Sequence, residues 1–318
     1  MFDKIMSLNA LQGARIWLRD HYAFNSKSTW YDFLKKTITK LGENDTSERA
    51  ASVSYSLILA VFPTVIFLFT LIPYITFIPN LQDQIMGFFR RALPGDTFSS
   101  VDTTIRDIIS QPRGGVLSLG FLLALYSATS GLVALMNAFN SSHRSEDKRG
   151  FFKIRGIAIG LTLTLAIALI LAVVGLIVGG VVSDFLLRFG ILNNVIFVYL
   201  LAIARYLIVF GVFVAAVSII YRYGPDVNMK WSFVTPGSVI ASVLIVLTSL
   251  AFSFYVSNFG SYNKVYGSIG TLIALMIWIN LIALLLIMGF EMNVALFNLE
   301  GDKNPNVEEK TADASVSK

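Results

Sequence analysis

The polar side chains with the clearest chemical potential in this sequence lie inside its most apolar stretch, residues 265–298. Asn280, Glu291 and Asn298 interrupt about 30 apolar residues, enough to cross a bilayer core of roughly 30 Å as a helix. At about 100° per residue, the three positions fall on one narrow line of that helix. A carboxylate at membrane depth is costly and normally faces protein or water. We therefore expect another part of the chain to supply a polar neighbour for Glu291.

Several polar residues are predicted to lie at the same depth as Glu291. Depth is counted from the ends of the predicted spans at about 1.5 Å per residue. The hydroxyl, amide or guanidinium of one or more of these residues is expected to hold the carboxylate. The candidate partners are Tyr55, Asn137, Tyr221, Arg149 and Arg222.

A second charged residue, Arg205, lies within another apolar segment. Its predicted depth is that of Asn280, about 15 Å from Glu291, so a direct ion pair between Arg205 and Glu291 is not expected. Two interpretations stay open. The two charges line a path for a solute or a lipid headgroup, with Glu291 titrating as in carriers. Alternatively, Glu291 anchors the helix at the interface and Arg205 extends outward to water.

A row of serines, which includes Ser242 and Ser249, follows one face of the segment 232–255. Such a face is compatible with helix packing or with the lining of a pore. Four further residues are candidate hinges, because proline interrupts helical hydrogen bonding and glycine relaxes the backbone. At Pro63 a packing kink and a gating hinge both remain open. The four hinge candidates are Pro63, Pro225, Gly267 and Gly270.

The composition defines the class of protein. Hydrophobic residues make up 55% of the chain and charged residues 14%, against about 45–50% and 25% in soluble domains. The chain is therefore a membrane protein. Its net charge of +5 is dispersed, which fits juxtamembrane loops better than nucleic-acid binding. Cysteine is absent, which excludes disulfides and cysteine-ligated metals.

Enzymatic motifs are absent from the sequence. The two histidines, His21 and His143, have no second ligand at metal-binding spacing. No HExxH, GxSxG or P-loop pattern occurs. We expect a protein that is not an enzyme and that uses no metal or cofactor.

Hydrophobic segments predict an all-α, polytopic membrane fold. Residues 1–49 form an amphipathic segment with interfacial helices, whose basic residues would face anionic lipid. Residues 50–298 form a six-helix domain with an outer amphipathic hairpin over 74–114, and 299–318 form a disordered tail. The expected spans are 50–72, 116–139, 154–182, 195–221, 232–255 and 267–298.

The distribution of Lys and Arg predicts the orientation. Basic residues cluster before the first span and in the loops 143–155 and 222–230, whereas the loops 184–194 and 258–267 carry few. Short basic loops stay in the cytosol. No signal peptide is evident at residues 1–18. We expect a multi-pass protein of the bacterial cytoplasmic membrane with both termini in the cytosol.

Dispersed motifs resemble those of the YihY/BrkB family of bacterial inner-membrane proteins. They are Ser54-Tyr55 with Phe62-Pro63, the segment 134–137, YRYGPDV with Lys230-Trp231, and YGSIG…W…GFEMN near the C-terminus. The resemblance covers roughly residues 30–300. It implies six spans and cytosolic termini. Members were once labelled ribonuclease BN, and the missing nuclease ligands agree with dropping that label.

The resulting functional hypothesis is a transporter or a lipid or solute translocase of unknown substrate. The alternative is a non-transporting membrane scaffold or envelope-integrity factor, which docks partners through its basic cytosolic loops. The expected partners are membrane lipids, anionic lipids among them, and an unidentified solute or lipid substrate, with no nucleic acid. The sequence leaves the oligomeric state open.

Overall fold

The computed structural model describes most of the chain and is almost entirely helical. The only β-type pairing among the described residues is an isolated β-bridge between Tyr22 and Thr29. The described residues are 12–22, 29–41, 45–76, 80–92, 95–142, 147–188, 195–226, 232–258 and 260–301. The expected all-α class is therefore confirmed.

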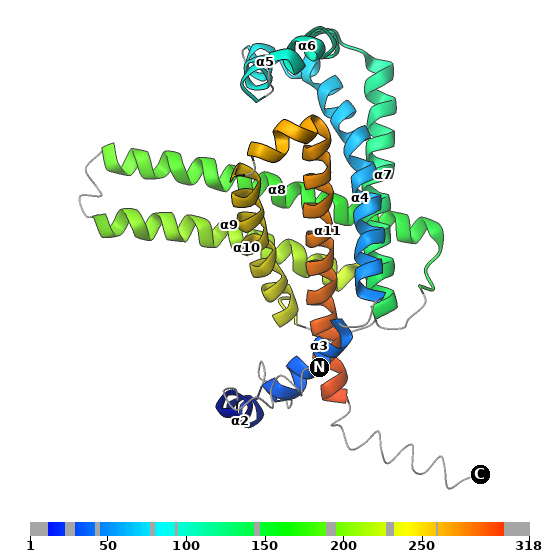
Figure 1. Cartoon of the computed structure of the whole chain (residues 1–318), viewed down its shortest axis with the longest axis vertical. Helices are drawn as coiled ribbons and strands as arrows, with labels where there is room; N and C mark the ends of the chain where they lie inside the picture. The colour runs from blue at the N-terminus through cyan, green and yellow to red at the C-terminus, as the bar shows by residue number, and fades with distance from the viewer. Residues whose placement is uncertain are drawn as a thin grey trace.

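Four long helices form the main bundle (Figure 1). They are α4 (Asp45–Leu71), α7 (Gly114–Ser142), α10 (Pro236–Asn258) and α11 (Gly260–Gly301). α4 packs closely along α7, and α11 packs against both α4 and α10. These helices are apolar on nearly every face, as is expected where both the core and the lipid are apolar.

A pair of helices, α8 (Phe151–Arg188) and α9 (Val195–Tyr223), projects from the side of this bundle. The two helices pack against each other as an antiparallel hairpin and run across the direction of α7 and α11 in Figure 1. Their outer parts expose many large apolar side chains. The hairpin is joined to the bundle by α7 at the start of α8 and by α10 along α9.

Short amphipathic helices cover both ends of the bundle. At one end, α5 (Leu81–Ala92) and α6 (Gly95–Ser110) pack on the short 3₁₀ helix η2 (Ile72–Tyr74) around buried Met86 and Ile109. At the other end, α3 (Trp30–Leu41) lies against α11 and follows α2 (Gln12–Asp20). We refer to this second end as the predicted cytosolic end.

Close packing fixes α10 against α11 near the predicted cytosolic end. A Cβ atom added to Gly289 would lie 2.5 Å from both Ala241 Cβ and Tyr221 Oη. Glycine therefore permits a helix approach that a larger residue would block. Beside this contact, the rings of Phe139 and Phe290 stack in the buried core, and the ring of Tyr221 meets both edge to face.

Six of the described helices are long and apolar enough to cross a membrane. Their bounds differ from the expected spans mainly where polar residues extend a helix: α4 begins at Asp45 rather than at residue 50, and α11 begins at Gly260 rather than at 267. The candidate spans are Asp45–Tyr74, Gly114–Ser142, Phe151–Gly180, Tyr199–Tyr223, Pro236–Val256 and Leu272–Leu296.

Candidate functional site: a buried ion pair between three helices

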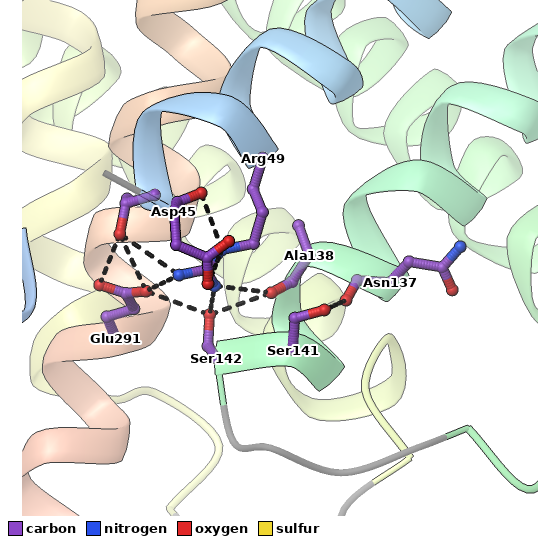
Figure 2. Close-up of polar contacts among 8 residues, drawn as sticks. Asp45, Arg49, Asn137, Ala138, Ser141, Ser142 and Glu291 are labelled. Carbon is purple, nitrogen blue, oxygen red and sulfur yellow. Dashed lines mark hydrogen bonds and ion pairs between the residues drawn. The ribbon is translucent and has the colours of Figure 1, made fainter. Parts of the chain in front are cut away.

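Glu291 lies in the interior of the bundle, with 2% of its surface exposed. Its carboxylate forms an ion pair with Arg49 of α4, at 2.8 Å between Glu291 Oε1 and Arg49 Nη2 (Figure 2). The two residues are 242 positions apart in the sequence. Only 12% of the Arg49 side chain is exposed. The pair therefore joins the first turns of α4 to the C-terminal part of α11.

Hydroxyl groups complete the shell around this ion pair. Thr46 Oγ1 donates to Glu291 Oε1 at 3.3 Å, and Ser142 Oγ approaches the same oxygen at 3.3 Å. Arg49 Nη1 donates to the carbonyl of Ala138 at 3.1 Å and to Ser142 Oγ. In Figure 2 the dashed lines from α4, α7 and α11 converge on Glu291 and Ser142. The cluster Thr46, Arg49, Ser142 and Glu291 is called the ion-pair site below.

The local sequence explains why α4 contributes to this site. Asp45-Thr46-Ser47-Glu48 has an acidic residue three positions before a glutamate, a pattern typical of a helix N-terminus. The helix therefore begins before the apolar run and carries Thr46 and Arg49 on successive turns of one face. Asp45 accepts from Arg49 through its carbonyl at 3.1 Å, which holds the guanidinium in place.

The expected partners of Glu291 were wrong. The side chains of Tyr55 and Asn137 are exposed, and Tyr221 Oη donates instead to the carbonyl of Leu286 at 2.7 Å. Arg149 bonds to Asp147 and to the carbonyl of Gly224, and Arg222 is exposed. Depth alone named the wrong residues because Tyr55 and Asn137 face away from α11. The N-terminal signature at Asp45 was the available signal for Arg49.

The other predicted path residues lie in separate places. Asn280 Nδ2 donates to Ser54 Oγ of α4 at 3.2 Å. Ser249 Oγ accepts from Trp278 Nε1 at 3.2 Å, a contact between α10 and α11. Ser242 is fully buried, and its Oγ has no hydrogen-bond partner among the described residues. Asn298 has a side chain outside the described part of the structure.

Arg205 is part of the α8–α9 hairpin and not of the ion-pair site. Its guanidinium lies over the ring of Tyr206, 5.0 Å from the centroid, and beside Gly179 and Gly180 of α8. Its buried Nε has no hydrogen-bond partner in the part of the chain that is described. The described contacts of Arg205 do not include Glu291.

The predicted hinge positions occur in different contexts. Pro63 lies inside α4, which continues from Asp45 to Leu71. Gly270 is buried within α11, and Gly267 belongs to the same helix, although its surroundings lie outside the described part. Pro225 is buried in the turn that follows α9. Whether any of these positions moves stays a prediction.

A second polar cluster joins the two loops that follow α7 and α9. Arg149 donates to both carboxylate oxygens of Asp147, at 2.8 and 2.6 Å, and to the carbonyl of Gly224 at 2.9 Å. Asn140 donates to Asp147 and accepts from the amide of Asp226. The hydrogen bonds from Arg149 lower the pKa of the Asp147 carboxyl below its usual range. We call Asn140, Asp147, Arg149 and Asp226 the loop clamp.

The ion-pair site can hold three helices together and release them if its charges separate. Replacing a buried ion pair with apolar residues is often neutral or stabilising. The pair is therefore weak evidence for a purely structural role. Within the described residues, no group of three or more His, Cys, Asp or Glu side chains could hold a metal ion.

Together, the fold and the site define a polytopic helical membrane protein whose helices are joined by a buried ion pair. The chain belongs to the family described as Virulence factor BrkB, whose model matches residues 37–313. The family resemblance inferred from the motifs is thus confirmed. No solved structure matches the chain.

Individual relatives carry uninformative or conflicting names. The chain is 32% identical to the "Putative ribonuclease-like protein YfkH" of Bacillus subtilis (strain 168), over 86% of this chain and 98% of that protein. It is 25% identical to a "UPF0761 membrane protein" of Psychrobacter sp. (strain PRwf-1), over 84% of this chain and 49% of that protein. This chain therefore spans about half the length of the Psychrobacter relative. A "UPF0761 membrane protein" of Mannheimia succiniciproducens is 24% identical, over 85% of this chain and 92% of that protein.

Proposed function

We propose that this protein is a transporter or a lipid or solute translocase of the bacterial cytoplasmic membrane, and that the ion-pair site is its gate at the cytosolic end. Both termini lie in the cytosol in this proposal, as the basic loops predict. The observation that carries the proposal is the buried pair of Arg49 and Glu291, which connects α4 to α11 beside the last turn of α7.

A buried ion pair is a costly way to join helices. Each ion of a buried pair loses several kcal/mol of hydration, and the attraction between the two seldom exceeds that loss by much. Apolar side chains would join the helices at lower cost. A charged pair has the additional property that water can stabilise both charges once they separate. Such a contact suits two alternative states, closed in this structure and open when the helices part.

The proposal does not include ribonuclease activity. The name of YfkH refers to ribonuclease-like character, but that name belongs to the relative. We propose that the present chain acts on membrane lipids or on a solute and not on nucleic acid.

A scaffold is the second candidate, and the loop clamp favours it. Arg149 and Asp147 have only 7% and 11% of their side chains exposed. Together with Asn140 and Asp226 they hold two predicted cytosolic loops in a fixed arrangement, a surface that could dock a partner protein.

Transport by reconstituted protein separates these candidates. The full chain is placed in vesicles that contain a trace of fluorescent phosphatidylglycerol, and a membrane-impermeant quencher measures its movement between leaflets. The wild type should accelerate this movement, and Glu291→Gln, which removes the ion pair that closes the proposed gate, should accelerate it further. Arg205→Ala should instead slow the movement if Arg205 lines the path. Lipid movement equal to that in protein-free vesicles, with a co-purifying stoichiometric partner, would favour the scaffold.

The absence of cysteine permits a direct test of the gate. Ser142 is buried against Glu291, so Ser142→Cys should react slowly with a membrane-impermeant thiol reagent. Combining it with Glu291→Gln should accelerate labelling if the ion pair holds the gate closed. A cysteine at exposed Ser141 is the matched control and should react equally fast in both backgrounds. Equal labelling of Ser142→Cys in both backgrounds would contradict the gate.

A further inference from the structure

A further arginine, Arg155 of α8, contacts the middle of α7. Its Nη1 donates to Thr129 Oγ1 at 2.9 Å, to Ser130 Oγ at 3.0 Å and to the carbonyl of Tyr126 at 3.4 Å. Tyr126 lies 12 residues after Gly114, and Ser130 lies 12 residues before Ser142, the two ends of α7. The guanidinium is therefore about 18 Å along the helix from either end. The sequence placed Arg155 at the end of the basic loop 143–155. In the structure, its guanidinium instead lies at mid-depth of the candidate span Gly114–Ser142.

Arg155 has no carboxylate partner among the described residues. Its Nη1 makes all three of its hydrogen bonds, and its Nε and Nη2 make none with the described residues. The guanidinium also lies 4.6 Å from the centroid of the Tyr126 ring and 5.6 Å from that of Phe151. Both rings are more than half exposed. The protein thus orients the cation through Nη1 and the two rings, and Arg155 itself is half-buried.

The ion-pair site contains the same arrangement of an arginine bound to α7, together with a counter-ion. In both places an arginine bonds to an α7 carbonyl and to the serine four residues further on, Ala138 with Ser142 and Tyr126 with Ser130. Each serine also donates back to that carbonyl. At Arg49, the carboxylate of Glu291 neutralises the charge. At Arg155, the described residues provide no anion.

We propose that Arg155, with Tyr126, Thr129 and Ser130, forms a binding site for a phosphate-bearing anion at mid-depth of α7. The Nε and Nη2 donors form one free edge of the guanidinium, which matches two phosphate oxygens in a bidentate manner. The aromatic rings of Tyr126 and Phe151 beside it suit the apolar part of a lipid. An uncompensated arginine at this depth is otherwise costly, and a bound anion removes that cost. This proposal concerns the binding of an anion, which can be measured whether or not the protein transports a substrate. It therefore goes beyond the proposed function.

Native mass spectrometry in dodecyl maltoside, a detergent without phosphate, tests the proposal on the full chain. The probe is dioleoyl phosphatidylglycerol, with dioleoylglycerol as the phosphate-free comparison. The wild type should retain phosphatidylglycerol and not dioleoylglycerol. Arg155→Gln should weaken retention at least about tenfold, which corresponds to the loss of one charged hydrogen bond. Arg106→Gln is the matched control, since Arg106 is an exposed arginine that pairs with Asp102 in α6.

A second variant leaves Arg155 in place. Ser130→Asp positions a carboxylate next to the guanidinium and should abolish retention of phosphatidylglycerol by supplying an internal anion. Competition by inorganic phosphate identifies the source of the ligand: displacement at millimolar concentration assigns a soluble phosphate compound, and persistence assigns a lipid. Wild-type retention in both Arg155→Gln and Ser130→Asp, or equal retention of dioleoylglycerol, would overturn the proposal. If Arg155→Gln does not fold, Ser130→Asp alone decides.

Discussion

The two arginine sites on α7 differ in one component. Arg49 and Arg155 each bond to a backbone carbonyl and a serine hydroxyl of this helix, and each has a threonine hydroxyl nearby. Arg49 also meets the carboxylate of Glu291, whereas Arg155 meets the faces of aromatic rings. A carbonyl and a serine of α7 thus bind an arginine at two places. The charge of Arg49, near one end of the helix, is neutralised within the protein, whereas Arg155, in the middle, is left cationic.

This difference separates a contact between helices from a contact with a ligand. A paired charge contributes to helix association and can act as a gate when the pair opens. An arginine without an internal anion attracts one from its surroundings, because the apolar environment strengthens the electrostatic attraction. The following predictions test whether the missing carboxylate is what distinguishes the two sites.

Removal of one charge from each site should give the largest contrast. Glu291→Gln leaves Arg49 buried without a counter-ion and should lower the free energy of unfolding by about 3–5 kcal/mol. Arg155→Gln removes a cation that has no protein counter-ion, so the change should stay within about 1 kcal/mol. Denaturant unfolding in mixed micelles measures both.

A double variant checks the cause of that loss. Arg49→Gln combined with Glu291→Gln removes both charges, so most of the stability lost in Glu291→Gln should return. Similar losses in Glu291→Gln and Arg155→Gln, or no recovery in the double variant, would show that the two sites do not differ as described.

The same substitution at the two serines should have opposite effects. Ser130→Asp gives Arg155 a carboxylate and should stabilise the α7–α8 contact, by up to about 1 kcal/mol for a partly exposed pair. Ser142→Asp places a second carboxylate beside Glu291 and should destabilise by roughly 2 kcal/mol through like-charge repulsion and burial. Melting temperatures in one detergent give the sign of each change. Changes of the same sign would contradict the assignment.

The loop clamp should give the smallest effect, and it depends on pH. Because the folded-state pKa of Asp147 is lowered by the hydrogen bonds from Arg149, its contribution is complete above the unfolded pKa of about 3.9. That contribution is lost as the pH falls through the lower folded-state value. Wild type should therefore lose more stability than Asp147→Asn between pH 6 and pH 3. Thermal unfolding across this range measures the difference, and parallel curves would exclude a role for the clamp.

The Asp147→Asn variant of the loop clamp also bears on the comparison of the arginine sites. Asn140 of the clamp lies two residues before Ser142 of the ion-pair site, on the last turn of α7. Asp147→Asn should leave retention of phosphatidylglycerol unchanged, because Tyr126 and Ser130 are more than two turns away along the helix. A lost lipid adduct in Asp147→Asn would mean that the α7–α8 contact depends on the clamp.

Local sequence determined which segments are helices long and apolar enough to cross a membrane, and it singled out Glu291 as a residue that needs a partner. These features depend on composition and on periodicity within about 30 residues, which each segment contains by itself. The all-α class followed for the same reason, whereas the family membership was inferred from motifs dispersed over the chain. The N-terminal pattern at Asp45 also lay within reach of sequence reasoning, since it indicated that α4 begins before its apolar run.

Tertiary structure alone decided which charges meet. Arg49 and Glu291 are 242 residues apart, and no periodicity within either helix encodes their pairing. The sequence located Arg155 in a basic loop, but the direction in which α8 leaves the bundle brings its guanidinium to the centre of α7. Depth along a helix can be counted from its ends, whereas its rotation and its neighbours depend on the packing of all the helices together. That packing neutralises Arg49, one of the two arginines that contact α7, within the protein and leaves Arg155 cationic.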